Sequence, residues 1–161
     1  MQVPPMLRPA TPEDESFLRE LFRETRAAEF AALSWAPAQV AALCNLQFDA
    51  QAAGYRTSFP QARHLIICDD HVPAGRMIKA ETGDGLLLVD LALLPAFRNR
   101  GWGSQLVRSL QEEARNRAVA LFLQVDKNGP AQALYRRLGF TVEGDDGVRY
   151  TMRWVHTSSF P

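Results

Sequence analysis

The chain has 161 residues, of which 47% are hydrophobic and 22% charged, and this balance excludes a disordered chain or a coiled coil. Lys and Arg together number 18, as do Asp and Glu, so the formal net charge is zero. Non-specific nucleic-acid binding draws on a net positive field, so we expect no nucleic-acid partner. The length is typical of a single domain, which we expect to cover residues 1–161.

The first half of the chain predicts a short edge strand, two helices and two strands. Thr11 is a candidate N-cap of the first helix, because a proline and two acids follow it. Gly54 is expected to end the second helix. The predicted ranges are a strand at 6–8, helices from 11 and over 37–51, and strands at 64–68 and 72–81.

The second half begins with the strongest strand signal, the apolar run from Leu86 to Leu94. Such a continuous run is typical of a central strand that is buried on both faces. Because a helical crossover connects it to the next strand, the two strands should be parallel. The remaining elements are predicted as a helix at 101–117, a strand at 121–125, a helix from 128 to 138 and a hairpin closing at 144–147. This order predicts an α/β fold with a mixed sheet.

The cysteines and histidines give no sign of a metal site or a disulfide framework. Cys44 and Cys68 lie in apolar surroundings without zinc-like spacing, which favours two buried, reduced thiols. The histidines lack the spacing of a metal-binding pair on a helix: His64, His71 and His156.

The sequence shows no membrane or export signal either. The chain starts without a basic segment followed by an apolar one, so we expect no secretory signal. Its longest apolar run is interrupted by Asp90 and is far shorter than the ~20 residues that span a bilayer. We therefore expect a cytoplasmic protein without a metal or a membrane partner.

The turn after the 86–94 strand contains two glycines, Gly101 and Gly103, and leads directly into a helix. Glycine lacks a Cβ, so the backbone can adopt positive φ and approach a ligand closely. The first amides of a helix have no partner within it and suit an anionic group such as a phosphate. Arg98 and Arg100 add positive charge beside the turn. An ordinary glycine-rich turn with two solvated arginines would explain the same residues.

Two common nucleotide-binding fingerprints do not fit this turn. A P-loop requires a lysine near its last glycine, whereas Gly103 is followed by Ser104 and Gln105. A Rossmann fingerprint requires a third glycine where Leu106 stands. A nucleotide-binding domain is therefore only a distant alternative.

Two ordered motifs in the second half are more specific than the glycines alone. The first is Arg98-Asn99-Arg100-Gly101-Trp102-Gly103, preceded by Leu91-x-Leu93-x-Pro95. The second is spread over Asn128, Ala131, Tyr135 and Gly139-Phe140. The chain resembles the GCN5-related N-acetyltransferases, the GNAT family, whose signature is Gln/Arg-x-x-Gly-x-Gly/Ala after the fourth strand. The resemblance extends from Leu86 to Trp154, whereas the first 60 residues match only in layout.

The resemblance implies a fold and a binding mode for acetyl-CoA as co-substrate. The fold would be a mixed, mostly antiparallel sheet with helices on both faces, splayed between its two central parallel strands. Backbone groups of three residues would pair with the pantetheine arm: Leu91, Ala92 and Leu93. The pyrophosphate would be held by the amides of Arg98, Asn99, Arg100, Gly101, Trp102, Gly103 and Ser104. Asn128 would bond the pantetheine, although its expected helix-capping role alone could explain it.

The resemblance also implies a catalytic role for Tyr135, whose hydroxyl would protonate the departing thiolate of the cofactor. From the residues alone, the favoured interpretation of Tyr135 is a core aromatic on the apolar face of a helix. A phenol with a pKa of ~10 stays protonated at neutral pH and can donate. Some family members have a glutamate base early in this strand, where Leu86, Leu87 and Leu88 stand here. Asp90, within the same strand, is the nearest acid, and it would be the base, relay water or pair with an arginine. Glu81, Glu24 and Glu29 are weaker candidates.

We predict a single-domain acetyltransferase that moves the acetyl group to a primary amine by direct attack in a ternary complex. The acceptor, a small molecule or a peptide, does not follow from the sequence. The alternative is a non-catalytic acyl-CoA-binding or regulatory module on the same fold. Exposed strand edges in such sheets often pair, so a homodimer is one of the states left open.

Overall fold

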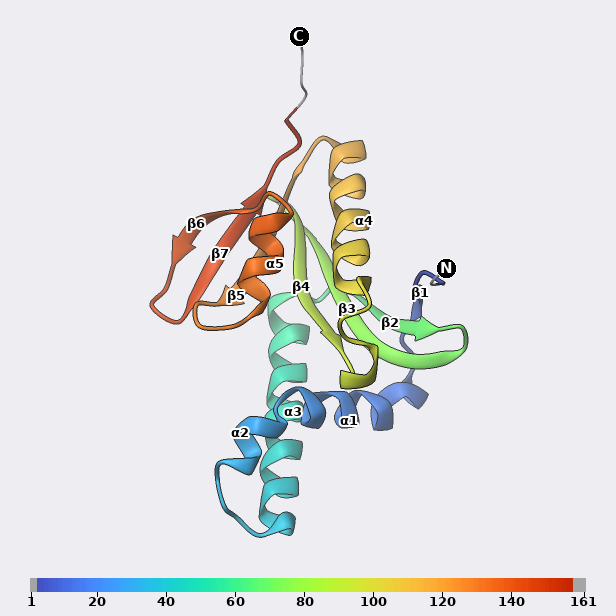
Figure 1. Ribbon diagram of the computed structural model, residues 1–161, viewed down its shortest axis with the longest axis vertical. Coiled ribbons are helices and arrows are strands. Elements are labelled where there is room, and N and C mark those ends of the chain that lie inside the picture. Colours follow the sequence, from blue (N-terminus) through green and yellow to red (C-terminus); the bar gives the residue numbers. More distant parts are fainter. Residues whose placement is uncertain (1–2, 158–161) are drawn as a thin grey trace. The chain divides into compact units, whose positions relative to one another are not determined.

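The computed structural model describes residues 3–157 and contains seven strands and five helices (Figure 1). The strands are β1 (Met6–Pro9), β2 (Arg63–Asp69), β3 (Val72–Thr82), β4 (Gly85–Leu93), β5 (Ala120–Asp126), β6 (Thr141–Asp145) and β7 (Arg149–Trp154). The helices are α1 (Glu15–Thr25), α2 (Ala27–Ala31), α3 (Pro37–Ser58), α4 (Trp102–Arg117) and α5 (Ala131–Arg137), with the short 3-10 turns η1 (Pro12–Asp14) and η2 (Pro95–Phe97). No helix among the described residues is long and apolar enough to cross a membrane.

The strands form one mixed sheet in the order β1-β2-β3-β4-β5-β7-β6. β4 and β5 are parallel, whereas β1 with β2, β5 with β7, and β6 with β7 are antiparallel. This confirms the predicted α/β fold, including the parallel relation that the α4 crossover requires.

The chain divides into two compact units. Unit 1 holds the residues up to Ile78 together with Leu91–Arg98, and unit 2 holds Lys79–Asp90 together with the residues from Asn99 onward. Strands β3 and β4 each run from one unit into the other. The prediction of a single domain over residues 1–161 stays a prediction.

Burial along β4 differs from the prediction of a strand that is covered on both faces. Leu86 and Leu88 are 1% and 4% exposed, but Val89 and Asp90 are only half-buried. Leu87 is also half-buried although it pairs with β5, so one face of β4 is covered less than the other. The pairing with β5 runs from Gly85 to Leu88. Past that point the two parallel strands separate within unit 2, and the side chains that follow keep part of their surface.

In unit 1 the helices α1, α2 and α3 contribute a cluster of buried residues, formed by Phe22, Phe30, Cys44 and Phe48. The rings of Phe22 and Phe48 meet edge to face with centroids 5.7 Å apart. Cys44 and Cys68 are both buried free thiols, as predicted. The predicted end of α3 is wrong, because the helix continues through Gly54 to Ser58. Gly54 does not adopt positive φ there, so it does not act as a cap.

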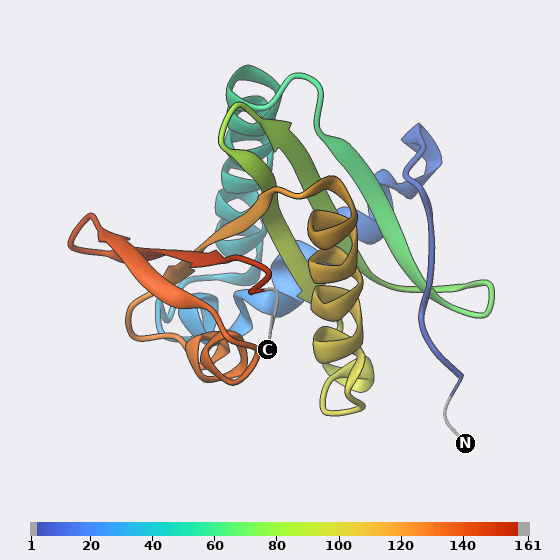
Figure 2. The same ribbon diagram turned by 90° about the horizontal axis from the view of Figure 1, so that it is seen from above.

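The core of unit 2 lies between α4 and β5. The predicted inward face of α4 is confirmed, since its four members are all buried: Leu106, Val107, Leu110 and Ala114. They lie at helical spacing, so they form one stripe along the helix. Figure 2 shows the β6–β7 hairpin, orange to red, with α5 beside it.

Candidate active site

The turn between β4 and α4 has the backbone shape that its glycines suggest. Asn99 and Gly101 both adopt left-handed backbone conformations, with φ of 62° and 79°. Gly101 is the N-cap of α4, and no side chain caps the helix at that position. The first amides of a helix otherwise rely on such a cap or on a ligand. The turn can therefore present main-chain N–H groups to an anion.

The two glycines of this turn have different structural roles. A Cβ on Gly101 would meet no atom within 4 Å, so this position is open and glycine is favoured there by the positive φ alone. A Cβ on Gly103 would lie 3.4 Å from the Cδ2 atom of Leu134 on α5. Gly103 therefore lets α5 approach the start of α4. The sequence predicted a ligand role for both glycines and gave no signal for this helix packing.

The strand segment predicted to bind the pantetheine arm, Leu91–Leu93, belongs to unit 1 and is half-buried. On its β3 side it approaches Gly75 so closely that an added Cβ would lie 2.2 Å from the carbonyl oxygen of Ala92. Gly75 is therefore needed for this close approach, and neither motif includes it. Arg98, also in unit 1, donates from Nε to the Leu93 carbonyl at 3.0 Å. Part of its guanidinium thus fixes the end of the strand.

Tyr135 lies on α5, where its side chain is buried and only 8% exposed. Its ring meets that of Phe140 edge to face, with the centroids 5.8 Å apart. The Tyr135 carbonyl accepts the N–H of Phe140 at 3.1 Å, which closes the end of α5. Among the described residues none hydrogen-bonds to the phenol oxygen, which leaves it available to a ligand.

Tyr135 and Asp90 act on one another electrostatically within unit 2. Burial raises the pKa of Tyr135 to about 12, and the negative charge of Asp90 adds to this effect. Both influences disfavour the phenolate, so Tyr135 is a protonated donor at neutral pH. Asp90 is half-buried at the point where β4 and β5 have separated. The two predicted catalytic residues therefore belong to the same unit as the glycine turn.

Asn128 is exposed in the connection between β5 and α5, and it does not cap the helix as predicted. The N–H of Gly129 first donates to the Asp126 carbonyl at 3.1 Å, which forms a turn. The helix consequently begins at Ala131, and Pro130 is its N-cap. The helix-capping explanation for Asn128 is therefore wrong.

The connection that carries Asn128 is anchored by residues that sequence reasoning missed. Lys127 donates from Nζ to the Asp145 carboxylate at 2.8 Å, and its N–H bonds the Val148 carbonyl at 3.1 Å. Gln132 donates to the Lys127 carbonyl at 2.7 Å. The two contacts of Lys127 with Asp145 and Val148 tie the connection to the β6–β7 hairpin, and no motif marks them because the partners lie far apart in sequence.

The remaining acidic candidates are less suited to the site. Glu81 is ion-paired with Arg117 at the opposite end of α4 from the glycine turn. Glu24 and Glu29 are exposed on α1 and α2 of unit 1. Residues 3–157 contain no group of three or more His, Cys, Asp and Glu side chains that could hold a metal ion.

Comparison with protein families matches this chain to an acetyltransferase family. Residues 15–140 match the model of the acetyltransferase (GNAT) family. The match spans most of the chain, so the chain belongs to this family. The predicted resemblance is thereby confirmed. No curated protein matches the sequence.

Solved structures agree with this assignment at the level of the fold. The chain is similar to the PaiA N-acetyltransferase from Thermoplasma acidophilum in complex with coenzyme A, with a TM-score of 0.72 and 18% identity over 96% of this chain and 100% of the other. It is similar to a ribosomal-protein alanine N-acetyltransferase from Escherichia coli, with a TM-score of 0.65 and 18% identity over 98% and 99% of the two chains. An acetyltransferase from Thermus thermophilus gives a TM-score of 0.67 at 20% identity over 95% and 97%.

The family match identifies the protein as an N-acetyltransferase of the GNAT family, which uses acetyl-CoA as co-substrate. The catalytic interpretation is favoured over a non-catalytic acyl-CoA-binding module. The open Gly101 position and the uncapped start of α4 fit the diphosphate of that co-substrate.

Proposed function

We propose that the protein transfers the acetyl group of acetyl-CoA to a primary amine by direct attack in a ternary complex. The observation that carries this proposal is the buried phenol of Tyr135, kept protonated next to Asp90 in the unit that holds the glycine turn. A buried phenol that stays protonated can donate a proton to a departing thiolate.

In this proposal the turn and the adjoining strand bind the co-substrate. The main-chain amides of Arg98, Asn99, Arg100, Gly101, Trp102, Gly103 and Ser104 hold the diphosphate. Backbone groups of Leu91, Ala92 and Leu93 pair with the pantetheine arm, as a peptide pairs with a strand edge. The Asn128 side chain bonds the same arm. Its exposure and the absence of a capping role support this assignment.

Tyr135 supplies a proton to the departing sulfur as the nitrogen–carbon bond forms and the carbon–sulfur bond breaks. The thioester provides an activated acyl group, so the protein mainly has to orient it and stabilise the leaving group. A phenol with a pKa of about 12 remains protonated at every pH at which the protein would work. Tyr135 therefore enters each turnover protonated, and the phenolate left after donation takes up a proton before the next turnover.

The acceptor amine must lose its proton before it attacks. A lysine-like amine with a pKa of ~10.4 lies about 3.4 units above neutral pH, so forming the free base costs about 4.6 kcal/mol. Asp90 is the acid whose charge reaches the catalytic phenol. In our proposal Asp90 accepts the proton that forms the free base, directly or through water, and passes it to solvent. The nitrogen loses a second proton as the carbon–nitrogen bond forms, and this proton replaces, through water, the one that Tyr135 gives to sulfur.

The cysteines support direct attack over an acetyl-cysteine intermediate. Cys44 is buried in the aromatic cluster of unit 1, and burial raises the pKa of its thiol. Cys68 is 4% exposed on β2. A thiol nucleophile needs an accessible thiolate, and neither cysteine offers one.

Release of free thiol on mixing acetyl-CoA with a panel of amines tests the proposal. The panel should include polyamines, aminoglycosides, free amino acids, and peptides with free N-termini or lysines. We expect amine-dependent release, with the acetyl group found on nitrogen by mass spectrometry. Binding of acetyl-CoA without release for any amine would instead indicate a regulatory module. Competition by free ATP would favour a nucleotide-binding protein.

We further propose a cytoplasmic location and a homodimer. Two buried reduced thiols suit a reducing compartment. The sheet ends on both sides in strands that pair on one edge only, β1 and β6, and such edges are natural pairing surfaces. Light scattering on a purified sample measures the mass directly, and a monomer at micromolar concentration would contradict the homodimer.

A further inference from the structure

Gln111 is a buried polar side chain that belongs to neither sequence motif. It lies on α4 and is only 8% exposed. Its neighbours on the helix, Leu110 and Ala114, belong to the apolar stripe and are buried as well. A buried amide without a hydrogen-bond partner destabilises a fold, so the partner of Gln111 shows what this side chain does there.

The partner of Gln111 is the end of the helix that carries Tyr135. The Nε2 atom of Gln111 donates to the Leu138 carbonyl at 2.7 Å, between residues that are 27 positions apart in the chain. Leu138 is the C-cap of α5, and the last carbonyls of a helix have no partner within it. Gln111 therefore ties α5 to α4 at the point where α5 ends.

The same end of α5 holds the ring of Tyr135. Gly139 follows the helix with a φ of 93°, and its N–H donates to the Arg136 carbonyl at 3.1 Å. The N–H of Phe140 donates to the Tyr135 carbonyl at 3.1 Å. These two bonds form a Schellman motif, in which the side chains at the two ends of the second bond pack together. The rings of Tyr135 and Phe140 are that pair, so the direction of the phenol depends on how α5 ends.

Helix α5 has only seven residues, so contacts with the rest of unit 2 determine its position. Midway along it, Leu134 meets Gly103 of α4, where an added Cβ would lie 3.4 Å from its Cδ2 atom. Gly103 and Gln111 are about two helical turns apart on α4. The first contact sets how closely α5 approaches α4, and the bond from Gln111 to the end of α5 sets its direction.

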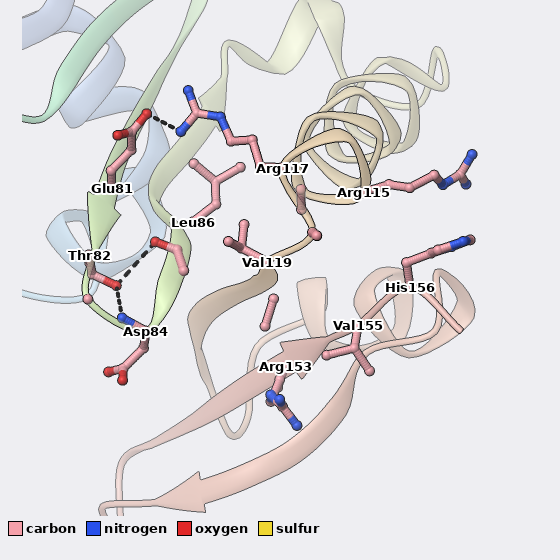
Figure 3. A pocket seen from close by; sticks show the side chains of 15 residues that line it. Glu81, Thr82, Asp84, Leu86, Arg115, Arg117, Val119, Arg153, Val155 and His156 are labelled. Atoms are coloured by element: carbon pink, nitrogen blue, oxygen red, sulfur yellow. Dashed lines mark hydrogen bonds and ion pairs between the residues drawn. The ribbon is translucent and has the colours of Figure 1, made fainter. Parts of the chain in front are cut away.

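Helix α4 is a fixed support for this bond. Lys79 on β3 donates from Nζ to the Glu113 carboxylate at 2.9 Å. Arg117, in the last turn of α4, is ion-paired with Glu81 on β3, and Figure 3 shows this pair beside the pocket at that end of the helix. These ion pairs join the second half of α4 to β3, so a side chain on α4 can hold α5 in place.

We propose that Gln111 is a positioning residue for acetyl transfer. By holding the end of α5, it keeps the phenol of Tyr135 directed at the departing sulfur. This inference rests on the proposed function, in which Tyr135 is the proton donor. Gln111 contacts no reacting atom and acts only through Tyr135.

Kinetics of Gln111→Met test this role, because methionine has a similar length and cannot donate. Thiol release is measured with acetyl-CoA and the amine of the panel that reacts fastest. We expect kcat to fall roughly tenfold, since a displacement of about 1 Å at a reacting group can cost on the order of a hundredfold. The KM of acetyl-CoA should stay the same, because the glycine turn is not altered. Gln111→His can donate from Nε2 at a similar length and should recover most of the lost kcat.

A second substitution separates positioning from a general loss of structure. In the Tyr135→Phe background, Gln111→Met should lower kcat no further, because no hydroxyl is left to position. Glu112→Gln is the control on α4, since it changes the exposed side chain next to Gln111 and should leave kcat unchanged. Gln111→Glu also removes the donor at neutral pH and replaces Gln111→Met if the latter does not fold.

NMR of the tyrosine rings tests the same bond without an acceptor amine. The chain has three tyrosines, and the signal that Tyr135→Phe lacks identifies Tyr135. Gln111→Met should shift this signal and leave those of Tyr55 and Tyr150 in place. Glu112→Gln should shift none of the three.

The proposal is overturned if Gln111→Met leaves the Tyr135 ring signal in place. It is also overturned if Gln111→Met keeps the wild-type kcat while Tyr135→Phe lowers it, or if it lowers kcat equally with and without the Tyr135 hydroxyl. Full kcat in Tyr135→Phe would instead contradict the proposed function, and the ring signals would still show whether Gln111 holds Tyr135.

Discussion

In the proposed mechanism the chemistry depends most on Tyr135, which combines burial, an electrostatic neighbour and a hydroxyl without a hydrogen bond to any described residue. Its ring packs on Phe140, which fixes the direction of the phenol. Its pKa of about 12 results first from burial and then from the charge of Asp90. Its burial on the apolar face of α5, which in the sequence suggests a core aromatic, therefore also keeps the phenol protonated as a donor.

Replacing Tyr135 by Phe should lower kcat roughly ten- to a thousandfold, the contribution of a general acid. The Kd of acetyl-CoA should not change, because the ring and its packing remain. Tyr150→Phe on β7 is the matched control, since it removes a phenol hydroxyl elsewhere in unit 2. Steady-state kinetics with calorimetry separate the two quantities. An unchanged kcat would remove Tyr135 from the mechanism.

The pH profile gives a second check at the same residue. A folded-state pKa of about 12 means that Tyr135 stays protonated as the pH rises to 10. Any fall of kcat between roughly pH 6 and 10 must then come from another group, such as the acceptor amine or its base. A basic limb near pH 9 that disappears in Tyr135→Phe would contradict the assigned pKa.

At the scale of elements, helix α3 shows that a single glycine can predict a helix end wrongly. Gly54 suggested a helix end, but the backbone there is helical and nothing lies within 4 Å of an added Cβ. The end is set four residues later, where the N–H of Phe59 bonds the Tyr55 carbonyl. A glycine signals a cap only where positive φ is required, and local sequence does not reveal that requirement.

Gly54→Ala should therefore raise the free energy of unfolding by about 0.5–1 kcal/mol, because alanine loses less backbone freedom in a helix interior. Thermal unfolding followed by circular dichroism would show an increase of roughly 2–4 °C. Gly83→Ala, in the open β3–β4 turn, is the control for a glycine outside a helix. A lower melting temperature for Gly54→Ala would mean that α3 ends near Gly54 after all.

For strand β4 and helix α5, the sequence predicted that each element exists, but not where the strand pairing ends or where the helix begins. The sequence predicted both elements and the buried stripe of α4, since each follows from apolar spacing. It did not predict that pairing with β5 ends at Leu88, because register depends on the partner strand. It also placed the start of α5 at Asn128, whereas a turn closed by Gly129 delays the helix.

At the scale of the whole molecule, the resemblance predicted the fold and family, and the motifs that carry it lie mostly in unit 2. The contacts that hold the N-terminal elements were not predicted, because they join residues without a motif. Arg8 on β1 forms a bidentate ion pair with Asp14 in η1, at 2.7 and 2.8 Å. Asp14 also accepts the N–H of Thr11 at 2.8 Å.

This pair predicts how the stability of the molecule depends on pH. The hydrogen bonds from Arg8 lower the pKa of Asp14 from 3.8 to about 2. A lowered carboxyl pKa stabilises the fold above the unfolded value, and this stability is lost as the pH falls from about 4 to 2. We expect a loss on the order of 1–2 kcal/mol, reduced by the 42% exposure of Arg8.

Urea unfolding at several pH values measures this effect. The wild type should lose stability between pH 4 and 2 more steeply than Asp14→Asn, which lacks the titrating group and should be less stable at pH 7. Asp49→Asn removes the exposed partner of Arg19 and should change the pH dependence little. Parallel curves for the wild type and Asp14→Asn would contradict the role of the pair.

The proposed function requires that main-chain nitrogens after β4 hold the diphosphate, and calorimetric titration of coenzyme A tests this most directly. Coenzyme A should bind the wild type, and pantetheine, which lacks the diphosphate, should bind far more weakly. Gly101→Ala should weaken coenzyme A binding at least about tenfold, since alanine disfavours the φ of 79° there. Gly83→Ala should bind normally. No heat with coenzyme A, or equal affinity in Gly101→Ala, would contradict the account.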